Sequence, residues 1–253
     1  MNAPLPPRVA LTCLWRTAAI NAGMTARGMQ QLGLLYVLAP ALRHLYPEPG
    51  ARRRAFARYA EHSNTHAFML PAYAGLLISM ESQIAAGSVP EAVIASLRQT
   101  LATTLSALGD SFFSGALRTS WALISICLVL CGYPVAAALF TGLLILLLMA
   151  FRITGFFYCL RNGIASLQWL RRLNIVCWTE RIKIVNALLI GATLWCMLMK
   201  EDVQDWPWQG RIGVCLFIPA AAWLVGKVHV PRTLLWLVAL GVVILLEAGY
   251  IRY

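Results

Sequence analysis

The sequence has 253 residues, 60% of them hydrophobic and 12% charged, with a formal net charge of +11. Soluble domains are about 45–50% apolar and about 25% charged, so this composition argues against a water-soluble fold and for lipid as the solvent. No basic face studded with aromatic residues points to nucleic acid, and the positive charge indicates Arg-rich loops beside anionic lipid. We therefore predict an all-α integral membrane protein with amphipathic N-terminal helices, re-entrant hairpins and several transmembrane helices.

Residues 1–60 differ in composition from the rest of the chain. Apolar patches alternate with polar and basic residues over 11–45, a pattern typical of amphipathic helices that lie at the membrane interface or on a neighbouring protein. A Pro- and Gly-containing turn at 47–50 then leads into an Arg-rich stretch, which the positive-inside rule places in the cytoplasm. We predict an amphipathic, Arg-rich helical arm over 1–60 and a membrane domain over 61–253.

The membrane domain is expected to begin with a re-entrant hairpin region at 61–118. The apolar stretch at 67–86 contains Pro71 and includes Glu81, and it is short for a membrane span. A weakly amphipathic stretch follows, with a face formed by Thr100, Thr103, Thr104 and Ser106. Such a face favours helix packing against protein, and it could also line a polar cavity. Irregular backbone at membrane depth is tolerated only against protein or a wet cavity, so this region is expected to have such neighbours.

The remaining elements alternate between apolar runs and charged loops. No charged residue occurs over 119–151, and Gly-Tyr-Pro at 132–134 divides this run into a helical hairpin with its turn outside the cell. A basic inner segment follows at 152–183, and spans at 184–253 place an acidic, Trp-containing loop at 200–211 and the C-terminus outside. The sequence thus predicts a multi-pass membrane protein.

The cysteines do not form a recognisable metal site. There are seven of them, scattered through apolar stretches without the short paired spacing that zinc ligands have. Cys127 and Cys131 lie one helical turn apart, but we interpret the seven as small buried hydrophobic residues. We predict no metal and no cofactor.

Two polar clusters stand out against the apolar background. The first is Glu-His-Ser-Asn-Thr-His at 61–66, and the second is Gly-Asp-Ser at 109–111 with Arg118 nearby. An acid at membrane depth costs about 2.5–3.5 kcal/mol or more, so Asp110 requires an explanation. It could pair with Arg118, or it could converge with Asn64 and Thr65 on a hydroxylated ligand, since carboxylates and amides bind hydroxyl groups well. The Ser-Asn-Thr-His string also suits a helix N-cap.

Several strings together resemble one protein family, the IID membrane components of the mannose/fructose/sorbose family of the sugar phosphotransferase system. The resemblance covers most of the chain in order. The matching strings are MQQLGLLYVLAPALRHLYPE (29–48), SNTHAF (63–68), GDSFFSGALR (109–118), FRITGFFYCLRNG (151–163) and PAAAWLVGKVHVPRTLLWLVALGVVI (219–244).

The resemblance implies a function and a location in the bacterial cytoplasmic membrane. A IID component pairs with a IIC subunit to translocate a hexose in an oligomeric complex, while separate IIA and IIB proteins carry the phosphate. IID is then a non-catalytic subunit without a phosphohistidine, so we expect no catalytic residue. The resemblance adds weight to Asn64, Thr65 and Asp110 as sugar-binding residues. The expected supporting residues are His66, a hydrogen-bonding wall, and Gly109, Ser111, Arg118 and Gln30.

The sequence departs from the family pattern at several places. Ser63 replaces an aromatic residue, Ala67 a proline, Ser114 a tryptophan and Thr119 a proline, and a Gly/Pro-containing stretch reads ATTLSA at 102–107. Loss of Gly and Pro should straighten helices that the family leaves broken. The outer segment at 200–211 is also short.

Two alternatives to a transporting subunit follow. A degenerate IID-like membrane protein would assemble or regulate without moving sugar. An intramembrane enzyme would use His66 and Asp110, but the sequence offers it neither a nucleophile nor a metal set.

Overall fold

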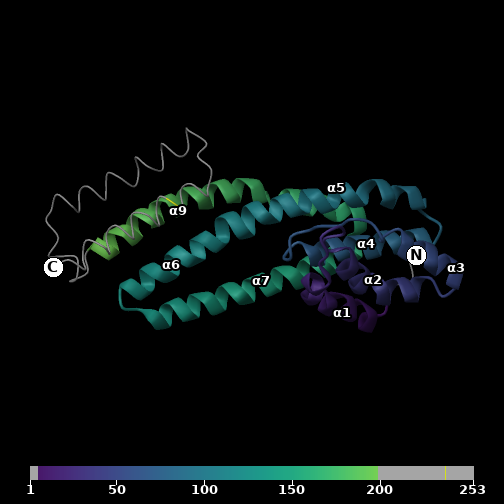
Figure 1. Ribbon diagram of the computed structural model, residues 1–253, viewed down its shortest axis with the longest axis horizontal. Coiled ribbons are helices and arrows are strands. Elements are labelled where there is room, and N and C mark those ends of the chain that lie inside the picture. The colour runs from purple at the N-terminus through teal and green to yellow at the C-terminus, as the bar shows by residue number, and fades with distance from the viewer. Residues whose placement is uncertain (1–4, 199–236, 238–253) are drawn as a thin grey trace. The chain divides into compact units, whose positions relative to one another are not determined.

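A computed structural model of the protein describes residues 5–198 and Leu237. In this part the chain forms helices and two isolated backbone bridges, without a strand (Figure 1). The predicted all-α fold class is therefore confirmed. The predicted outer loop at 200–211, the C-terminal spans beyond residue 198 and the position of the C-terminus lie outside the described residues.

The described part contains α-helices, short 3₁₀ segments and one π-helical segment. In chain order they are α1 (Pro7–Arg16), η1 (Thr17–Gly23), α2 (Gln31–Leu45), α3 (Pro49–Ala57), α4 (Leu70–Ala85), α5 (Glu91–Gly109), the π-helix η2 (Asp110–Leu117), α6 (Arg118–Leu130), α7 (Pro134–Asn162), η3 (Gly163–Ala165), α8 (Ser166–Arg172) and α9 (Ile175–Leu198). One compact unit extends to Thr193. The predicted arm at 1–60 is thus part of the same packed unit as α4 and α7, not a separate one.

The turn predicted at 47–50 starts α3. Glu48 is the N-cap, and its carboxylate accepts hydrogen bonds from the backbone N–H groups of Gly50, at 2.8 Å, and Ala51. Pro49 occupies the first helical position, where its missing N–H group has no consequence. These contacts satisfy backbone donors that a helix start otherwise leaves free.

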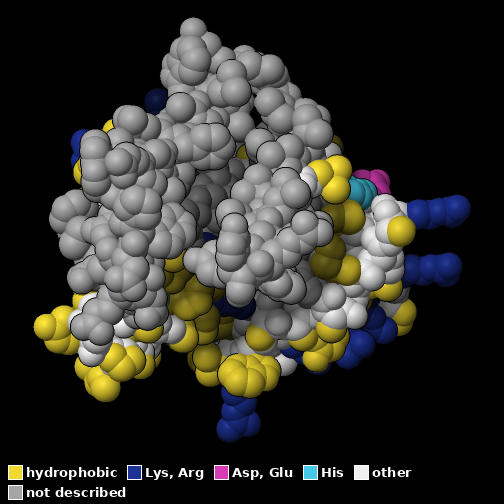
Figure 2. Space-filling view, turned by 60° about the vertical axis from the view of Figure 1, so that its left-hand side comes forward, with side chains coloured by type: hydrophobic (Ala, Val, Ile, Leu, Met, Phe, Trp, Pro, Cys, Tyr) yellow, Lys and Arg dark blue, Asp and Glu magenta, His cyan; other side chains and the backbone are white. Residues whose placement is uncertain are grey.

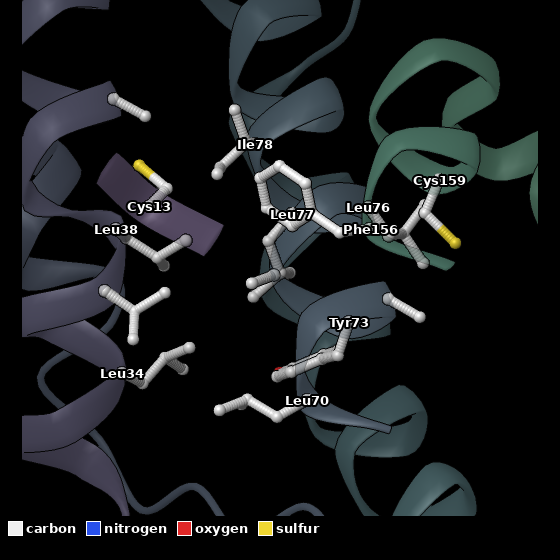
Figure 3. Close-up of a cluster of buried hydrophobic side chains, with 14 of the residues drawn as sticks. Cys13, Leu34, Leu38, Leu70, Tyr73, Leu76, Leu77, Ile78, Phe156 and Cys159 are labelled. Atoms are coloured by element: carbon white, nitrogen blue, oxygen red, sulfur yellow. The ribbon is translucent and has the colours of Figure 1, made fainter. Parts of the chain in front are cut away.

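Helix α4 is the centre of the core. It is buried along most of its length and packs against α7, α2, α5 and α1, as expected of a helix that is apolar all round. Figure 3 shows Leu77 and Ile78 of α4 between α2 and the α7 side chains Phe156 and Cys159. Gly75 brings the backbones together, because a Cβ atom there would lie 2.4 Å from the carbonyl oxygen of Phe156. The stretch at 67–86, expected as part of a re-entrant hairpin with protein neighbours, is therefore mostly a core helix enclosed by protein.

A single continuous helical stretch, Glu91–Leu130, contains α5, η2 and α6. The predicted boundary between residues 118 and 119 falls inside it, so the two hairpins expected there share one helix. The reason is local: residues 102–118 contain no proline, and the chain accommodates Gly109 and Gly115 in helical geometry. At 1.5 Å per residue the stretch is about 60 Å long, twice the hydrocarbon thickness of a bilayer. Only part of it can lie in lipid.

Helices α6 and α7 form a hairpin that displays apolar side chains. The turn falls at the predicted Gly-Tyr-Pro, where Gly132 has a φ of +86° and the N–H of Tyr133 donates to the carbonyl of Leu128 at 2.8 Å. Leu143 and Leu146 of α7 are 57% and 68% exposed. Two described stretches, Glu91–Leu130 and Pro134–Thr193, are long and apolar enough to cross a membrane, yet little of either is buried. Figure 2 shows hydrophobic side chains on the surface and separate, projecting Lys and Arg side chains. Lipid or partner helices must cover these faces.

Candidate functional site

A cavity of about 270 Å³ brings the two predicted polar clusters together. Its walls come from three places in the chain: η1 and the turn before α2, the loop before α4, and the last turn of α5 with the first residue of η2. The lining residues are Asn21, Met24, Gln30, Asn64, Thr65, His66, Ala67, Ser106 and Asp110. We call this the polar cavity. The predicted convergence of Asn64, Thr65 and Asp110 is present in its geometry.

Gln30 fixes the back wall of the polar cavity. Its side chain is buried, its amide nitrogen donates to Oδ1 of Asn21 at 3.2 Å, and its Oε1 accepts from the N–H of Thr65 at 2.8 Å. Its own backbone N–H donates to the carbonyl of Ser63 at 2.8 Å. A buried amide with both ends bonded holds two loops at a set distance. Gln30 therefore holds Asn21 and Thr65 in fixed positions, because its side chain is buried and bonded at both ends.

Thr65 has a hydroxyl group without a partner. The residue is 1% exposed, and its Oγ1 is buried with no hydrogen bond among the described residues. Leaving a buried hydroxyl unpaired costs about 1–3 kcal/mol, so such groups in native structures usually have a functional explanation. Thr65 lines the polar cavity, but its Oγ1 is buried, so the hydroxyl meets a bound molecule only after the side chain turns toward the cavity.

His66 forms the wall between the polar cavity and its surroundings. Its Nδ1 accepts from the backbone N–H of Phe68 at 3.3 Å, which leaves Nε2 as the protonated nitrogen that donates to Oγ of Ser114 at 3.1 Å. Its ring stacks on Phe113, with centroids 5.3 Å apart and planes at 14°. Burial lowers the pKa of this loop residue; Asp110 raises it and Arg118 lowers it. His66 is thus held as a neutral, doubly bonded wall.

Asp110 is the acidic group of the polar cavity. It is the first residue of the π-helical segment and is exposed, and Oγ of Ser106 donates to its Oδ2 at 3.4 Å. The ion pair considered between Asp110 and Arg118 is not formed among the described residues, since Arg118 follows eight residues later and lines a different cavity. Single π-helical turns often occur at functional sites. Apart from the long bond from Ser106, the Asp110 carboxylate therefore has acceptor capacity free for the polar cavity.

The remaining predicted residues have other positions. Gly109 lies directly behind the His66 ring. Ser111 is exposed and does not line the polar cavity, and Arg118 lines a second cavity on the other face of His66. The sequence predictions missed Asn21 as a lining residue, because it lies in a stretch without a distinctive pattern. Ser106 belongs to the Thr- and Ser-rich face that could line a polar cavity, and it lies one helical turn before Asp110.

Arg152 was also missed, although it lies in one of the family strings. From α7 its guanidinium donates to the carbonyl of Ala67 at 3.0 Å and to Oγ1 of Thr17 at 3.0 Å. These bonds tie the cavity loop and the N-terminal segment to α7. The signal available in sequence was an arginine that ends a charge-free run and has no acidic residue nearby in the sequence to pair with.

A buried charge network lies on the other side of α4. Glu81 is 1% exposed and accepts hydrogen bonds from Arg58 at 2.7 Å, from the hydroxyl of Tyr46 at 2.6 Å and from that of Tyr59 at 2.7 Å. Arg58 also reaches Glu91 at the start of α5, at 2.8 Å. The network joins α2, α3, α4 and α5. The sequence analysis placed the Arg-rich stretch that contains Arg58 in the cytoplasm and gave Arg58 no partner; the structure shows its side chain to be only 11% exposed.

The helices, the exposed apolar hairpin and the polar cavity define an all-α integral membrane protein. Residues 5–200 match the model of a family described as PTS system mannose/fructose/sorbose family IID component. This match covers most of the chain, so the chain belongs to that family. The resemblance found in the sequence is confirmed.

Two curated relatives give the extent of the similarity. The PTS system mannose-specific EIID component of Escherichia coli (strain K12) is 30% identical over 166 residues, which are 65% of this chain and 59% of the relative. The Fructose permease IID component of Bacillus subtilis (strain 168) is 28% identical over 165 residues, 65% of this chain and 60% of the relative. The aligned part thus spans less than two thirds of each relative.

Solved structures share the fold. One described only as a membrane protein has a TM-score of 0.76 and 23% identity, and the match covers 98% of this chain and 97% of that one. The mannose transporter ManYZ, solved by cryo-EM in a complex with microcin E492, has a chain with a TM-score of 0.59 and 24% identity, over 97% of this chain and 96% of that one.

Proposed function

We propose that this chain is the IID subunit of a phosphoenolpyruvate-dependent sugar phosphotransferase permease, which translocates a hexose of the mannose/fructose/sorbose class together with a IIC subunit. Membership of the IID family and relatives named for mannose and fructose support this role. In this proposal Asn64, Thr65 and Asp110 hold the sugar in the polar cavity.

One observation carries the proposal for the site: residues of both polar clusters, Asn64 and Thr65 from the loop before α4 and Asp110 from η2, line one cavity. A hydroxyl group donates one hydrogen bond and accepts others, an amide does both, and a carboxylate accepts. Thr65, Asn64 and Asp110 therefore offer the mixture of donors and acceptors that sugar hydroxyls require.

The charge of the polar cavity favours a neutral sugar over its phosphate ester. Asp110 is the charged residue among those that line it, and Arg118 lies in the other cavity. A sugar phosphate would bring like charge beside the Asp110 carboxylate, which disfavours binding. The site is thus suited to hold the substrate before phosphorylation and to release the product afterwards.

Phosphate transfer belongs to other proteins in this proposal. A separate IIB protein, supplied by IIA, donates the phosphate, and this chain is a non-catalytic subunit. Both ring nitrogens of His66 are already bonded, to Phe68 and Ser114. This supports a structural role for His66 rather than a role as a phosphate carrier. The exposed apolar faces of α7 and α9 support a membrane partner, and we expect the chain to be unstable or inactive without IIC.

The test is uptake and phosphorylation of a panel of hexoses by bacteria that express the chain with and without its IIC partner. Thr65→Val keeps the shape but removes the hydroxyl, and it should lower uptake of the preferred hexose about tenfold. Thr103→Val is the matched control, because the Thr103 hydroxyl is exposed on α5 and bonds to the carbonyl of Gln99 in its own helix. Equal uptake by both variants would count against the site.

A second candidate is an assembly or regulatory role without transport. The uninterrupted helical stretch Glu91–Leu130 favours it, because a helix without a break near the site is stiffer. This role would be supported over translocation if the purified complex binds sugar while the bacteria take up none of the hexoses in the panel.

A further inference from the structure

A second cavity lies on the far side of His66, between α6 and α7. It has a volume of about 390 Å³ and is closed at one end by the loop before α4. Most of its lining is aliphatic or aromatic, and it includes Phe68, Leu144 and Leu148, with Arg118 among its few polar residues. We call it the hairpin cavity. Its size falls within the range of small-ligand sites, about 300–1,000 Å³.

The polar side chains of the hairpin cavity are satisfied, apart from one. Ser114 bonds to His66, and the indole N–H of Trp121 donates to Oγ1 of Thr141 at 2.9 Å. Arg118 is exposed and makes neither a hydrogen bond nor an ion pair within the described residues. The cavity thus combines an apolar interior with one unpaired cation at its edge.

The position of Arg118 in the sequence indicates its depth in the membrane. Arg118 and Arg152 flank the charge-free run of the hairpin, and both lie beside Phe68 at its base, where Arg152 is 5.9 Å from the ring centroid. Charged residues that flank an apolar span lie at the headgroup level, and Trp121 next to Arg118 suits that level as well. Arg152 is committed to Ala67 and Thr17, so Arg118 is the arginine that remains available.

We propose that the hairpin cavity binds a membrane phospholipid, with an acyl chain along Leu144 and Leu148 and the headgroup phosphate on Arg118. An apolar solute alone would leave the cation unpaired, and a free anion would leave the apolar interior empty. An amphipathic phosphodiester matches both parts. The guanidinium offers several N–H donors in a planar fork that fits phosphate oxygens.

The test uses the full chain purified in a neutral detergent with its membrane partner, titrated with phosphatidylglycerol and followed by native mass spectrometry. Diacylglycerol with the same acyl chains is the arm without phosphate, and inorganic phosphate is the arm without an apolar part. The native protein should bind phosphatidylglycerol at least threefold more tightly than diacylglycerol, and inorganic phosphate should not displace it.

Two variants separate the parts of the site. Arg118→Gln should weaken phosphatidylglycerol binding about three- to tenfold and leave diacylglycerol binding unchanged. Leu144→Trp fills the cavity and should weaken both. Arg161→Gln is the control, since Arg161 is an exposed arginine at the end of α7 outside the hairpin cavity.

Arg118 is exposed, so its replacement should not affect folding, and its result decides the proposal even if Leu144→Trp misfolds. Equal affinity of the native protein for the two lipids would overturn the proposal. Equal loss of phosphatidylglycerol binding in the Arg118 and Arg161 variants would overturn it too, since that indicates a diffuse charge effect. Displacement by inorganic phosphate would identify a free-anion site instead.

Discussion

Gly109 and His66 are in such close contact that a Cβ atom on Gly109 would lie 2.3 Å from Cβ of His66 and 2.5 Å from its Cγ. Cβ of His66 is fixed to the backbone of the cavity loop, so it cannot move away as the end of a flexible side chain could. The helix α5 therefore needs glycine at this point to bring Asp110 and Ser106 up to the loop that carries Asn64 and Thr65.

We predict that Gly109→Ala destabilises the protein by about 1–3 kcal/mol, the usual cost of overpacking, although alanine is the better helix former. Thermal unfolding in detergent, followed by circular dichroism, measures the effect. Gly142→Ala in α7 is the matched control, because a Cβ there meets no atom within 4 Å. That control should be neutral or slightly stabilising. Two variants with the same melting temperature would contradict the close contact.

The Glu81 network should be one of the main stabilising contacts between α4 and its neighbours. Glu81→Gln replaces one acceptor oxygen by a donor and removes the charge that faces Arg58, so we expect a loss of about 3 kcal/mol in the free energy of unfolding. The value lies at the low end for a buried pair because Glu91 still contacts Arg58. Glu180→Gln breaks the exposed pair with Lys183 and should cost about 0.5 kcal/mol or less. A comparable loss of unfolding free energy in both variants would show that the Glu81 network stabilises the protein no more than an exposed ion pair does.

Stability should fall in mildly acidic solution because of His66. Burial lowers the pKa of His66 below the value of 6.5 that it has when unfolded. Below about pH 6.5 the unfolded chain therefore binds a proton that the folded chain resists, and the free energy of unfolding decreases as the pH falls. Above this pH the residue adds no slope. His66→Gln should flatten the profile below about pH 6.5, the pKa of an unfolded histidine. If the slope persists in the His66 variant, other titratable groups cause the loss of stability at low pH.

The basic segments predict the orientation in the membrane. We expect residues 43–58 and 161–183 in the cytoplasm and residues 200–211 with Tyr253 outside, because Lys and Arg are concentrated in the first two. Single cysteines can be placed at Arg172 and at Asp205 in a background without other reactive cysteines. A membrane-impermeant thiol reagent on intact cells should label the second and spare the first. The reverse pattern would invert the topology.

The sequence was sufficient for the fold class and for most of the polar cavity. Asn64, Thr65 and Asp110 are polar groups in an otherwise apolar chain, and the cost of leaving such groups in lipid is what made them visible. Their convergence depends on Gln30 and Gly109, which position the two segments through a buried amide and a close backbone approach. Both residues occur in the family strings, so the resemblance identified them before their contacts were known.

Other features could not be predicted because they depend on tertiary pairing. Arg58 looks like one of several surface arginines until α4 brings Glu81 to it. Asn21 acquires its place only through Gln30, nine residues away. The boundary predicted between residues 118 and 119 instead falls inside one helix, since the chain passes through η2 in π-helical turns without leaving the helix. Local sequence patterns report propensities. The positions of Arg58 and Asn21 follow from contacts between separate segments, whereas the unbroken helix follows from the local absence of proline over residues 102–118.

The most direct test of the central claim is the affinity of the purified complex for its preferred hexose, with and without the Asp110 charge. Asp110→Asn keeps the shape of the side chain, and loss of a hydrogen bond to a charged group should weaken sugar binding about tenfold or more, while assembly with the IIC subunit stays intact by size-exclusion chromatography. His66→Gln should have a smaller effect, because an amide can replace the bonds of a neutral imidazole. If Asp110→Asn binds the hexose within about twofold of the native affinity, the polar cavity is not the sugar site.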